Sequence, residues 1–293
     1  SIQRTLEAYL AEATRRTLAQ ERPTIVAMTG SVGKSSTRQA VAAFLGAGRT
    51  GSGVRASAKN YNNELGLPLT VFDMSAPGRS PLTWIRLLLK AYLTARGWRK
   101  TGVRTFILEM GADKQGDIAH LTHIAPPDVA IVTGVTPEDA SLPPVHLAKY
   151  PSIEALTEEK ATLVRQVRPN GVVVLNADDP RVFAMRHLTH AQVHTYGETD
   201  AADIRIMSRE VKTEERAWGR EPIGLEIHLQ IYNHLKTYVI PGVFGRSIAY
   251  AWAAASGVAD ALDVSQESLD EAAAQFKALP GRTRIIQGRN GVT

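Results

Sequence analysis

The residues that most clearly indicate chemistry lie between positions 29 and 36. They read Thr29-Gly-Ser-Val-Gly-Lys-Ser-Ser36, between an apolar run and a segment with helical spacing. Glycines in such a loop let backbone N–H groups surround a phosphate, and the N-terminus of the next helix adds positive potential. Lys34 is then expected to reach the outer phosphates, and Ser35 to offer a hydroxyl to Mg²⁺. The common phosphate-loop pattern has a glycine where Met28 stands, so this is a shorter variant, and its alternative is a tight turn with a solvated lysine.

Glu109 is a second candidate, because it ends the apolar run 105–109. In open α/β sheets ligands gather at the carboxyl ends of strands, where a carboxylate can meet a cation held by a phosphate loop. A glutamate in this position is as often a helix cap or an ion-pair partner, so both interpretations remain.

Three further sets of residues carry no distinctive pattern when taken alone. His146 near a Pro-Pro pair is typical of a loop histidine. Lys160 follows two glutamates in a helical segment, which is typical of a solvated ion-pair partner. Asn62 and Asn63 precede a glycine and a proline, where asparagine is a normal turn residue.

The phosphate loop is expected to be positioned by alternating strands and helices. Strands are predicted at 24–28, 105–109, 128–133, 172–176 and 193–196, and helices at 35–45, 82–96, 117–123, 153–168 and 180–188. This alternation predicts an α/β fold in which a mostly parallel, phosphate-loop-containing sheet is flanked by helices. Alternating segments at 204–206, 225–231 and 237–240 predict a small antiparallel β patch. Helices at 247–261 and 265–279 and a strand at 282–288 are expected to follow.

Composition excludes several classes of protein. The 293 residues are 44% hydrophobic and 22% charged, which is typical of a globular chain. The net charge of +5 favours anionic small molecules as partners, but no basic stripe with interleaved aromatics indicates nucleic acid. The absence of cysteine excludes disulfides, zinc knuckles and thiol nucleophiles. With no apolar stretch of about 20 residues and an acidic first helix, we expect a cytoplasmic protein.

The segment 81–96 is rich in leucine and carries basic residues, and Trp98, Arg99 and Lys100 follow it. This combination suits a helix that lies on an anionic membrane as a peripheral contact. The commoner role of such a helix is to pack its leucine face on the sheet.

Several stretches in this order resemble the ATP-dependent Mur ligases of peptidoglycan synthesis. The asparagine-rich stretch makes the resemblance greatest to the branch that adds D-alanyl-D-alanine. The shared stretches are 29–36, 59–70, 108–118, 145–147, 159–161, 174–179 and 280–284. The apolar spacing of 1–22, ended by Pro23, predicts an N-terminal helix. The resemblance implies a central ATP-binding domain at 23–285 with the antiparallel patch at about 203–240, and the start of a linker at 286–293. Compared with that family, the chain is expected to lack the N-terminal UDP-binding domain and the C-terminal domain.

The resemblance also implies roles for individual residues. ATP would be held by Thr29, Gly30, Ser31, Val32, Gly33, Lys34, Ser35, Ser36 and Asn176. Ser35 and Glu109 would hold one Mg²⁺, and His146 with an N-carboxylated Lys160 would hold a second. Lys34, Glu109, His146 and Lys160 would be catalytic, whereas Asn62, Asn63, Asp113 and Gln115 would lie on the substrate side. The adenine contacts do not carry over, because Arg246, Ser247 and Tyr250 stand where the family usually has a histidine and asparagines.

The reaction that the resemblance implies is an ATP-dependent amide ligation through an acyl phosphate. Its partners would be ATP, a carboxylate-bearing peptide or peptidoglycan precursor, and an amino acid or dipeptide acceptor. A nucleotide-binding regulatory or scaffold module derived from a Mur ligase is an alternative. A folylpolyglutamate-synthase-like ligase is another, which the asparagines at 60–63 disfavour.

Overall fold

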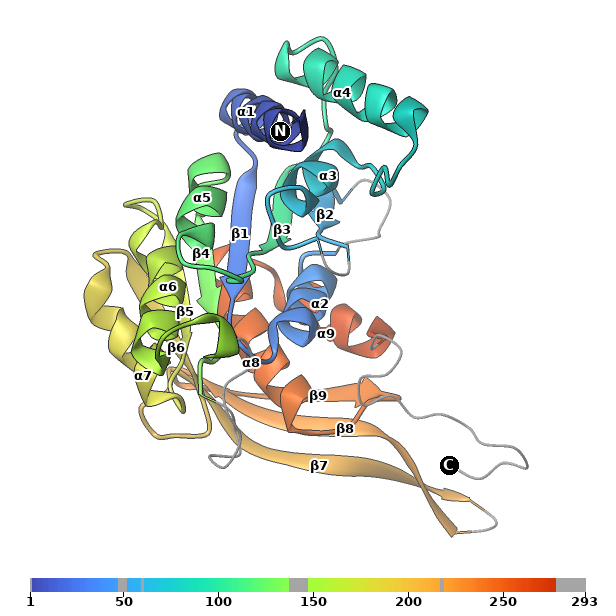
Figure 1. Cartoon of the computed structure of the whole chain (residues 1–293). Coiled ribbons are helices and arrows are strands. Elements are labelled where there is room, and N and C mark those ends of the chain that lie inside the picture. Colours follow the sequence, from blue (N-terminus) through green and yellow to red (C-terminus); the bar gives the residue numbers. More distant parts are fainter. Residues whose placement is uncertain (1, 47–51, 59–60, 137–146, 217–218, 278–293) are drawn as a thin grey trace.

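The computed structural model describes residues 2–46, 52–58, 61–136, 147–216 and 219–277 (Figure 1). The strands in this part of the chain form one sheet of nine, in the order β2-β3-β1-β4-β5-β6-β7-β8-β9. Pairing is parallel from β2 across to β7, and antiparallel between β7 and β8 and between β8 and β9. The strands are β1 Thr24–Thr29, β2 Val54–Ala56, β3 Thr105–Glu109, β4 Val129–Val132, β5 Val172–Asn176, β6 Gln192–Gly197, β7 Ile204–Arg216, β8 Gly219–Ile231 and β9 His234–Pro241.

Helices cover both faces of the sheet. They are α1 Ile2–Glu21, α2 Lys34–Phe44, α3 Gly66–Phe72, α4 Pro81–Ala95, α5 Asp117–Ile124, α6 Ile153–Arg165, α7 Pro180–Ala184, α8 Arg246–Ala261 and α9 Gln266–Gln275, with 3-10 turns at Leu147–Lys149 and Met185–Leu188. Figure 1 shows α2, α8 and α9 on one side of the sheet and α5, α6 and α7 on the other, with α1 and α4 at the end farthest from β7–β9.

The hydrophobic core is accordingly divided in two by the sheet. Side chains of a strand alternate between its faces, so Val26 and Met28 of β1 join the cluster with α2 and α8, whereas Ile25 and Ala27 join the other cluster. β1 is therefore apolar on both faces, as expected of a central parallel strand. It delivers its carboxyl end, and the phosphate loop that follows, to the edge where β3, β4 and β5 also end.

The predicted fold class is confirmed: a mostly parallel sheet flanked by helices, with an antiparallel patch. The patch is larger than predicted, because β7 and β8 extend through charged residues of exposed strand that carry no alternating apolar pattern. The short β2 and α3 were not predicted, and the helix expected at 180–188 is α7 followed by a 3-10 turn. The helix expected at 265–279 ends at Gln275, and the strand expected at 282–288 lies outside the described residues.

No helix within the described ranges is both long enough and apolar enough to cross a bilayer.

Candidate nucleotide and substrate site

The phosphate loop joins β1 to α2, as predicted. Gly33 has a φ of 84° and precedes the first residue of α2, so the left-handed conformation that glycine tolerates turns the chain into the helix. Lys34 Nζ donates a hydrogen bond of 2.5 Å to the carbonyl of Gly30, which holds the ammonium over the loop. The positive end of α2 and this cation therefore lie at the same edge of the sheet.

Thr133 and Gly134, which follow β4, hydrogen-bond to the phosphate loop. The Thr133 hydroxyl donates to the carbonyl of Val32 at 2.5 Å, and the backbone N–H of Ser31 donates to the carbonyl of Gly134 at 2.6 Å. A Cβ built on Gly30 would lie 2.0 Å from Thr133 Oγ1, so glycine is required there by space. Sequence reasoning missed Thr133 and Gly134, although a threonine and a glycine at the end of a neighbouring strand were a usable signal.

Glu109 lies at the end of β3, beside Met28 of β1, and is buried. Its Oε1 forms an ion pair with the Arg38 guanidinium, with Nε 2.8 Å away, and both side chains are 8% exposed. Arg38 lies one helical turn beyond Lys34 in α2. The ion-pair interpretation of Glu109 is therefore present in the structure, and the residue lies at the same edge of the sheet as the phosphate loop.

Lys160 is fully buried in α6, and not solvated as its charged neighbours suggested. Its Nζ has no hydrogen-bond partner among the residues that the structure describes. Burial, followed by repulsion from the Lys34 ammonium, lowers the pKa of Lys160 to about 7, whereas Glu159 and Asp113 act in the opposite direction. Near neutral pH this amine is thus neutral in a large fraction of molecules.

Glu159 connects α6 to the loop before α5. Its two carboxylate oxygens accept from the backbone N–H groups of Gly116 and Ile118, each at 2.8 Å. A carboxylate at a helix N-terminus is favoured by the unpaired N–H groups and the helix dipole. The consecutive residues Glu159 and Lys160 therefore tie α6 to α5 on one side and bring an amine close to the phosphate loop on the other.

A cavity of about 290 Å³ lies beside the phosphate loop. Asn176 lines it and donates to the carbonyl of Thr133 at 3.0 Å. On its far side Tyr250 donates to Asp178 at 2.5 Å and accepts from Arg246 at 2.5 Å. Burial and the Asp178 hydrogen bond raise the pKa of Tyr250. Arg246, Ser247 and Tyr250, at which no adenine contacts could be predicted from the resemblance, therefore form a polar wall of this cavity.

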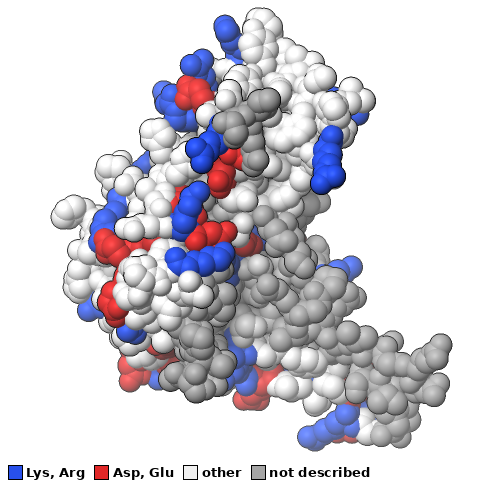
Figure 2. Space-filling view, in the orientation of Figure 1, with Lys and Arg blue, Asp and Glu red and all other residues white. Residues whose placement is uncertain are grey.

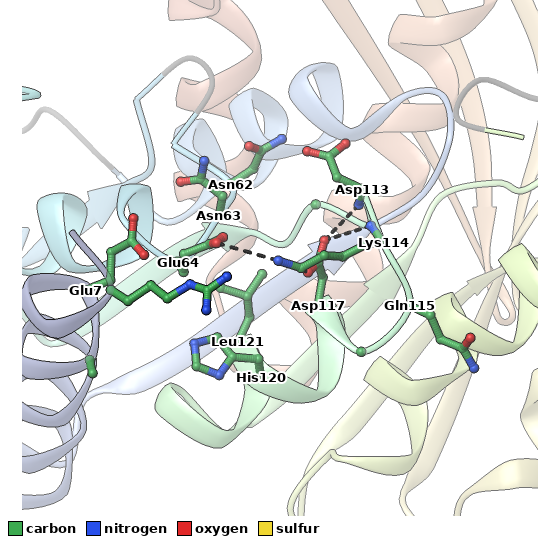
Figure 3. Close-up of a pocket in the computed structure, with 14 residues that line it drawn as sticks. Glu7, Asn62, Asn63, Glu64, Asp113, Lys114, Gln115, Asp117, His120 and Leu121 are labelled. Atoms are coloured by element: carbon green, nitrogen blue, oxygen red, sulfur yellow. Dashed lines mark hydrogen bonds and ion pairs between the residues drawn. The ribbon is translucent and has the colours of Figure 1, made fainter. Parts of the chain in front are cut away.

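A larger cavity, of about 650 Å³, is lined by all four residues predicted to lie on the substrate side (Figure 3). Asn62 and Asn63 come from the segment before α3, and Asp113 and Gln115 from the loop before α5. In Figure 3 the Gln115 side chain extends away from the other three. Asn63 also has a structural role, because its Oδ1 accepts from the Gly66 N–H at the start of α3 at 2.9 Å.

Charged residues surround this larger cavity, which we call the acidic-and-amide cavity. Lys149 pairs with Asp113 at 2.7 Å, and Lys114 lies 3.9 Å from Glu64. The first helix also contributes to the wall, through Arg4, Glu7 and Ala8 of α1. Nothing in the sequence of α1 indicated that it would reach this cavity.

His146 lies outside the described residues, so its relation to Lys160 stays a prediction. Among the residues that are described, no group of three or more His, Cys, Asp and Glu side chains is arranged to hold a metal ion. The predicted metal ligands include Ser35 and a carboxylated Lys160, and a group made of His, Cys, Asp and Glu side chains contains neither residue type.

Comparison with known sequences shows which protein family the chain is similar to. Residues 87–244 match the Mur ligase middle domain. The UDP-N-acetylmuramoyl-tripeptide–D-alanyl-D-alanine ligase of Mycobacterium bovis is 36% identical over 197 residues, which are 67% of this chain and 32% of that protein. The ligase of the same name from Bacillus subtilis is 26% identical over 206 residues, 70% of this chain and 35% of the relative. The chain thus spans about a third of the length of these relatives.

Solved structures share the fold. MurF from Thermotoga maritima, determined in complex with ADP, has a TM-score of 0.72 at 23% identity, covering 97% of this chain and 55% of that one. MurF from Acinetobacter baumannii has a TM-score of 0.72 at 21% identity, covering 96% and 52%. FolC from Escherichia coli is less similar, with a TM-score of 0.56 at 16% identity, covering 95% and 63%.

Proposed function

The chain belongs to the Mur ligase family, and on that premise we propose that it carries the ATP site of an amide ligase of the D-alanyl-D-alanine-adding type. The γ-phosphoryl group of ATP would transfer to a carboxylate oxygen of a peptidoglycan-precursor peptide, releasing ADP. The acceptor amine would then attack the acyl carbon, losing a proton and displacing phosphate to leave an amide. Lys160 is the single observation that carries this proposal. Its amine is buried within electrostatic reach of Lys34 and has no hydrogen-bond partner in the described part of the chain, so it has no evident role in stability.

The residues present fit a nucleotide with Mg²⁺. Gly30 and Gly33 belong to a loop that requires glycine, for space at Gly30 and for a positive φ at Gly33, at the N-terminus of α2 and beside the cavity that Asn176 lines. In this proposal Lys34 and the loop amides hold the phosphates, and Ser35 and Glu109 hold one Mg²⁺. Mg²⁺ supplies neutralisation of the charge on the transferring phosphoryl group.

Lys160 fits a second cation site after modification. CO₂ adds only to a neutral amine, and a lysine whose pKa is lowered to about 7 offers one near neutral pH. The resulting carbamate carries oxygen ligands and a negative charge, which a hard cation prefers to an ammonium. We propose that this carbamate and His146 would hold a second Mg²⁺.

The acidic-and-amide cavity is the proposed substrate side. Its wall contains Asn62, Asn63, Asp113 and Gln115. Because Glu159 fixes the loop before α5 and Lys160 follows it in α6, the substrate loop and the proposed metal ligand share one rigid element. In this proposal α6 would hold the substrate loop and the metal ligand in a fixed relation, and such positioning lowers the cost of a two-substrate step.

The proposal is tested by measuring phosphate release from ATP·Mg²⁺ with the precursor tripeptide and D-alanyl-D-alanine, each alone and both together. The expected result is release that needs both substrates, with the amide product identified by mass spectrometry. Lys34→Ala is expected to abolish it, whereas the matched control Lys236→Ala, in β9, leaves it unchanged. Release that is independent of both substrates would favour a regulatory module, and release that needs a folate and glutamate would favour the FolC-like alternative.

A further inference from the structure

Helix α4 buries only one of its sides. Leu87, Ala91 and Thr94 are buried against the neighbouring helices α1 and α3. Leu82, Ile85 and Leu89 are 56%, 60% and 55% exposed, and Tyr92 and Trp98 continue the row at 38% and 73%. At about 100° per residue, positions 82, 85, 89 and 92 lie within about 80° of one another, opposite the buried side. The buried side of this helix therefore packs mainly on α1 and α3, and the expected packing on the sheet is wrong. Five large apolar side chains face outward.

The same segment is strongly basic. Residues 74–108 contain seven Lys and Arg and no Asp or Glu. Five of these cations are exposed: Arg79, Arg86, Arg96, Arg99 and Lys100. Over the described ranges, Arg79, Arg86, Arg99 and Lys100 form no ion pair with a carboxylate, and Arg96 lies over the ring of Tyr92 at 5.3 Å. These charges are thus available to an external anion.

We propose that the outer side of α4, with Trp98 to Lys100, is a docking surface for an anionic phospholipid membrane. We call it the α4 surface. In Figure 2 the end of the molecule that α4 forms is covered by white and blue atoms without red. Apolar side chains inserted to the acyl boundary and cations at the level of the phosphates are the pattern by which interfacial helices bind.

Charge also decides against a second copy of the chain as the occupant. A two-fold contact through the α4 surface would bring the same five exposed cations against one another without a carboxylate between them. Like charges brought together in this way oppose association. Anionic headgroups, in contrast, neutralise the cations while the acyl region takes up the leucines. The docking is independent of nucleotide, since none of these residues lines the cavity beside the phosphate loop.

Co-sedimentation of the 293-residue chain with vesicles tests the proposal. The chain is expected to bind vesicles of phosphatidylcholine with about 30% phosphatidylglycerol at low salt and to be released by about 0.5 M salt. Vesicles of phosphatidylcholine alone are expected to bind it far more weakly. Brominated lipids in the anionic vesicles are expected to quench tryptophan fluorescence, and Trp98→Phe to remove most of that quenching.

Matched variants distinguish vesicle binding through the α4 surface from nonspecific adsorption. Arg86→Gln with Arg99→Gln is expected to weaken binding about 25-fold, since each cation near an anionic surface contributes about fivefold. Leu89→Asp is expected to weaken it at least about tenfold. The controls are Arg220→Gln with Lys236→Gln, and Leu235→Asp at a leucine 75% exposed in β9. Neither control should change binding by more than about twofold.

Three results would overturn the proposal. One is the absence of binding to anionic vesicles at low salt. A second is binding that the control variants weaken as much as the α4 variants do. The third is a lipid-free dimer, seen by analytical ultracentrifugation, that Leu89→Asp dissociates, because that would identify a second copy as the occupant.

Discussion

Replacing Lys160 by methionine is expected to stabilise the protein while removing the proposed metal ligand. The side chain is fully buried, and its pKa falls from 10.5 to about 7 on folding. The unfolded chain therefore binds more protons than the folded chain between pH 7 and 10.5, so this group destabilises the fold most at low pH, and the penalty fades as the pH rises. With 1.36 kcal/mol per pKa unit, the penalty is about 4 kcal/mol at pH 7 and about 2 kcal/mol at pH 9.

The assay is urea unfolding followed by circular dichroism, in buffers stripped of CO₂ so that the amine stays unmodified. Lys160→Met is expected to exceed the parent in free energy of unfolding at pH 7, and the difference is expected to shrink by about 2 kcal/mol at pH 9. Lys100→Met, which replaces an exposed lysine, is the control and should show no such pH dependence. A Lys160→Met variant that is less stable than the parent by the same amount at both pH values would refute the reasoning, because the amine would then be a structural partner and not a buried charge.

Three further substitutions test the local geometry. Gly30→Ala is expected to weaken ATP binding at least about tenfold in calorimetry, since its Cβ would meet Thr133 Oγ1 at 2.0 Å. Adding Thr133→Ala should restore part of the affinity, and unchanged binding by Gly30→Ala would contradict the packing. Arg38→Met is expected to lower the free energy of unfolding by about 3–5 kcal/mol, because it leaves the Glu109 carboxylate buried without its partner; urea unfolding should show most of this recovered when Glu109→Gln is added. Asn63→Ala is expected to cost about 1 kcal/mol in the same assay, as its oxygen holds the start of α3, and no loss would remove the structural role.

The sequence predicted the parallel part of the fold well, because its strands are short apolar runs bounded by glycine or polar residues. β3 Thr105–Glu109 and β5 Val172–Asn176 begin and end where predicted. β2 was missed, since three half-buried residues that include Arg55 have neither length nor an apolar pattern. α3 was missed because Gly66 and Pro68 open it, and its helical state depends on tertiary contacts.

The candidate site was predictable where one local pattern carries the chemistry. The loop before α2 is such a pattern, and the structure has it between β1 and α2. The burial of Lys160 was not predictable, because the two glutamates that precede it, Glu158 and Glu159, suggest a solvated helix face. Glu159 is in fact buried against the start of α5. Likewise, Arg4 is brought to the acidic-and-amide cavity by packing between helices distant in sequence.

Calorimetric titration of the chain with ATP·Mg²⁺ tests the central claim most directly. The account predicts saturable binding that Lys34→Ala weakens by about 10- to 150-fold, because the substitution removes a charge-assisted contact worth about 1.5–3 kcal/mol. Lys236→Ala, remote from the loop in β9, should bind as the parent does. If Lys34→Ala binds ATP·Mg²⁺ as tightly as the parent, the loop between β1 and α2 is not the nucleotide site and the account is contradicted.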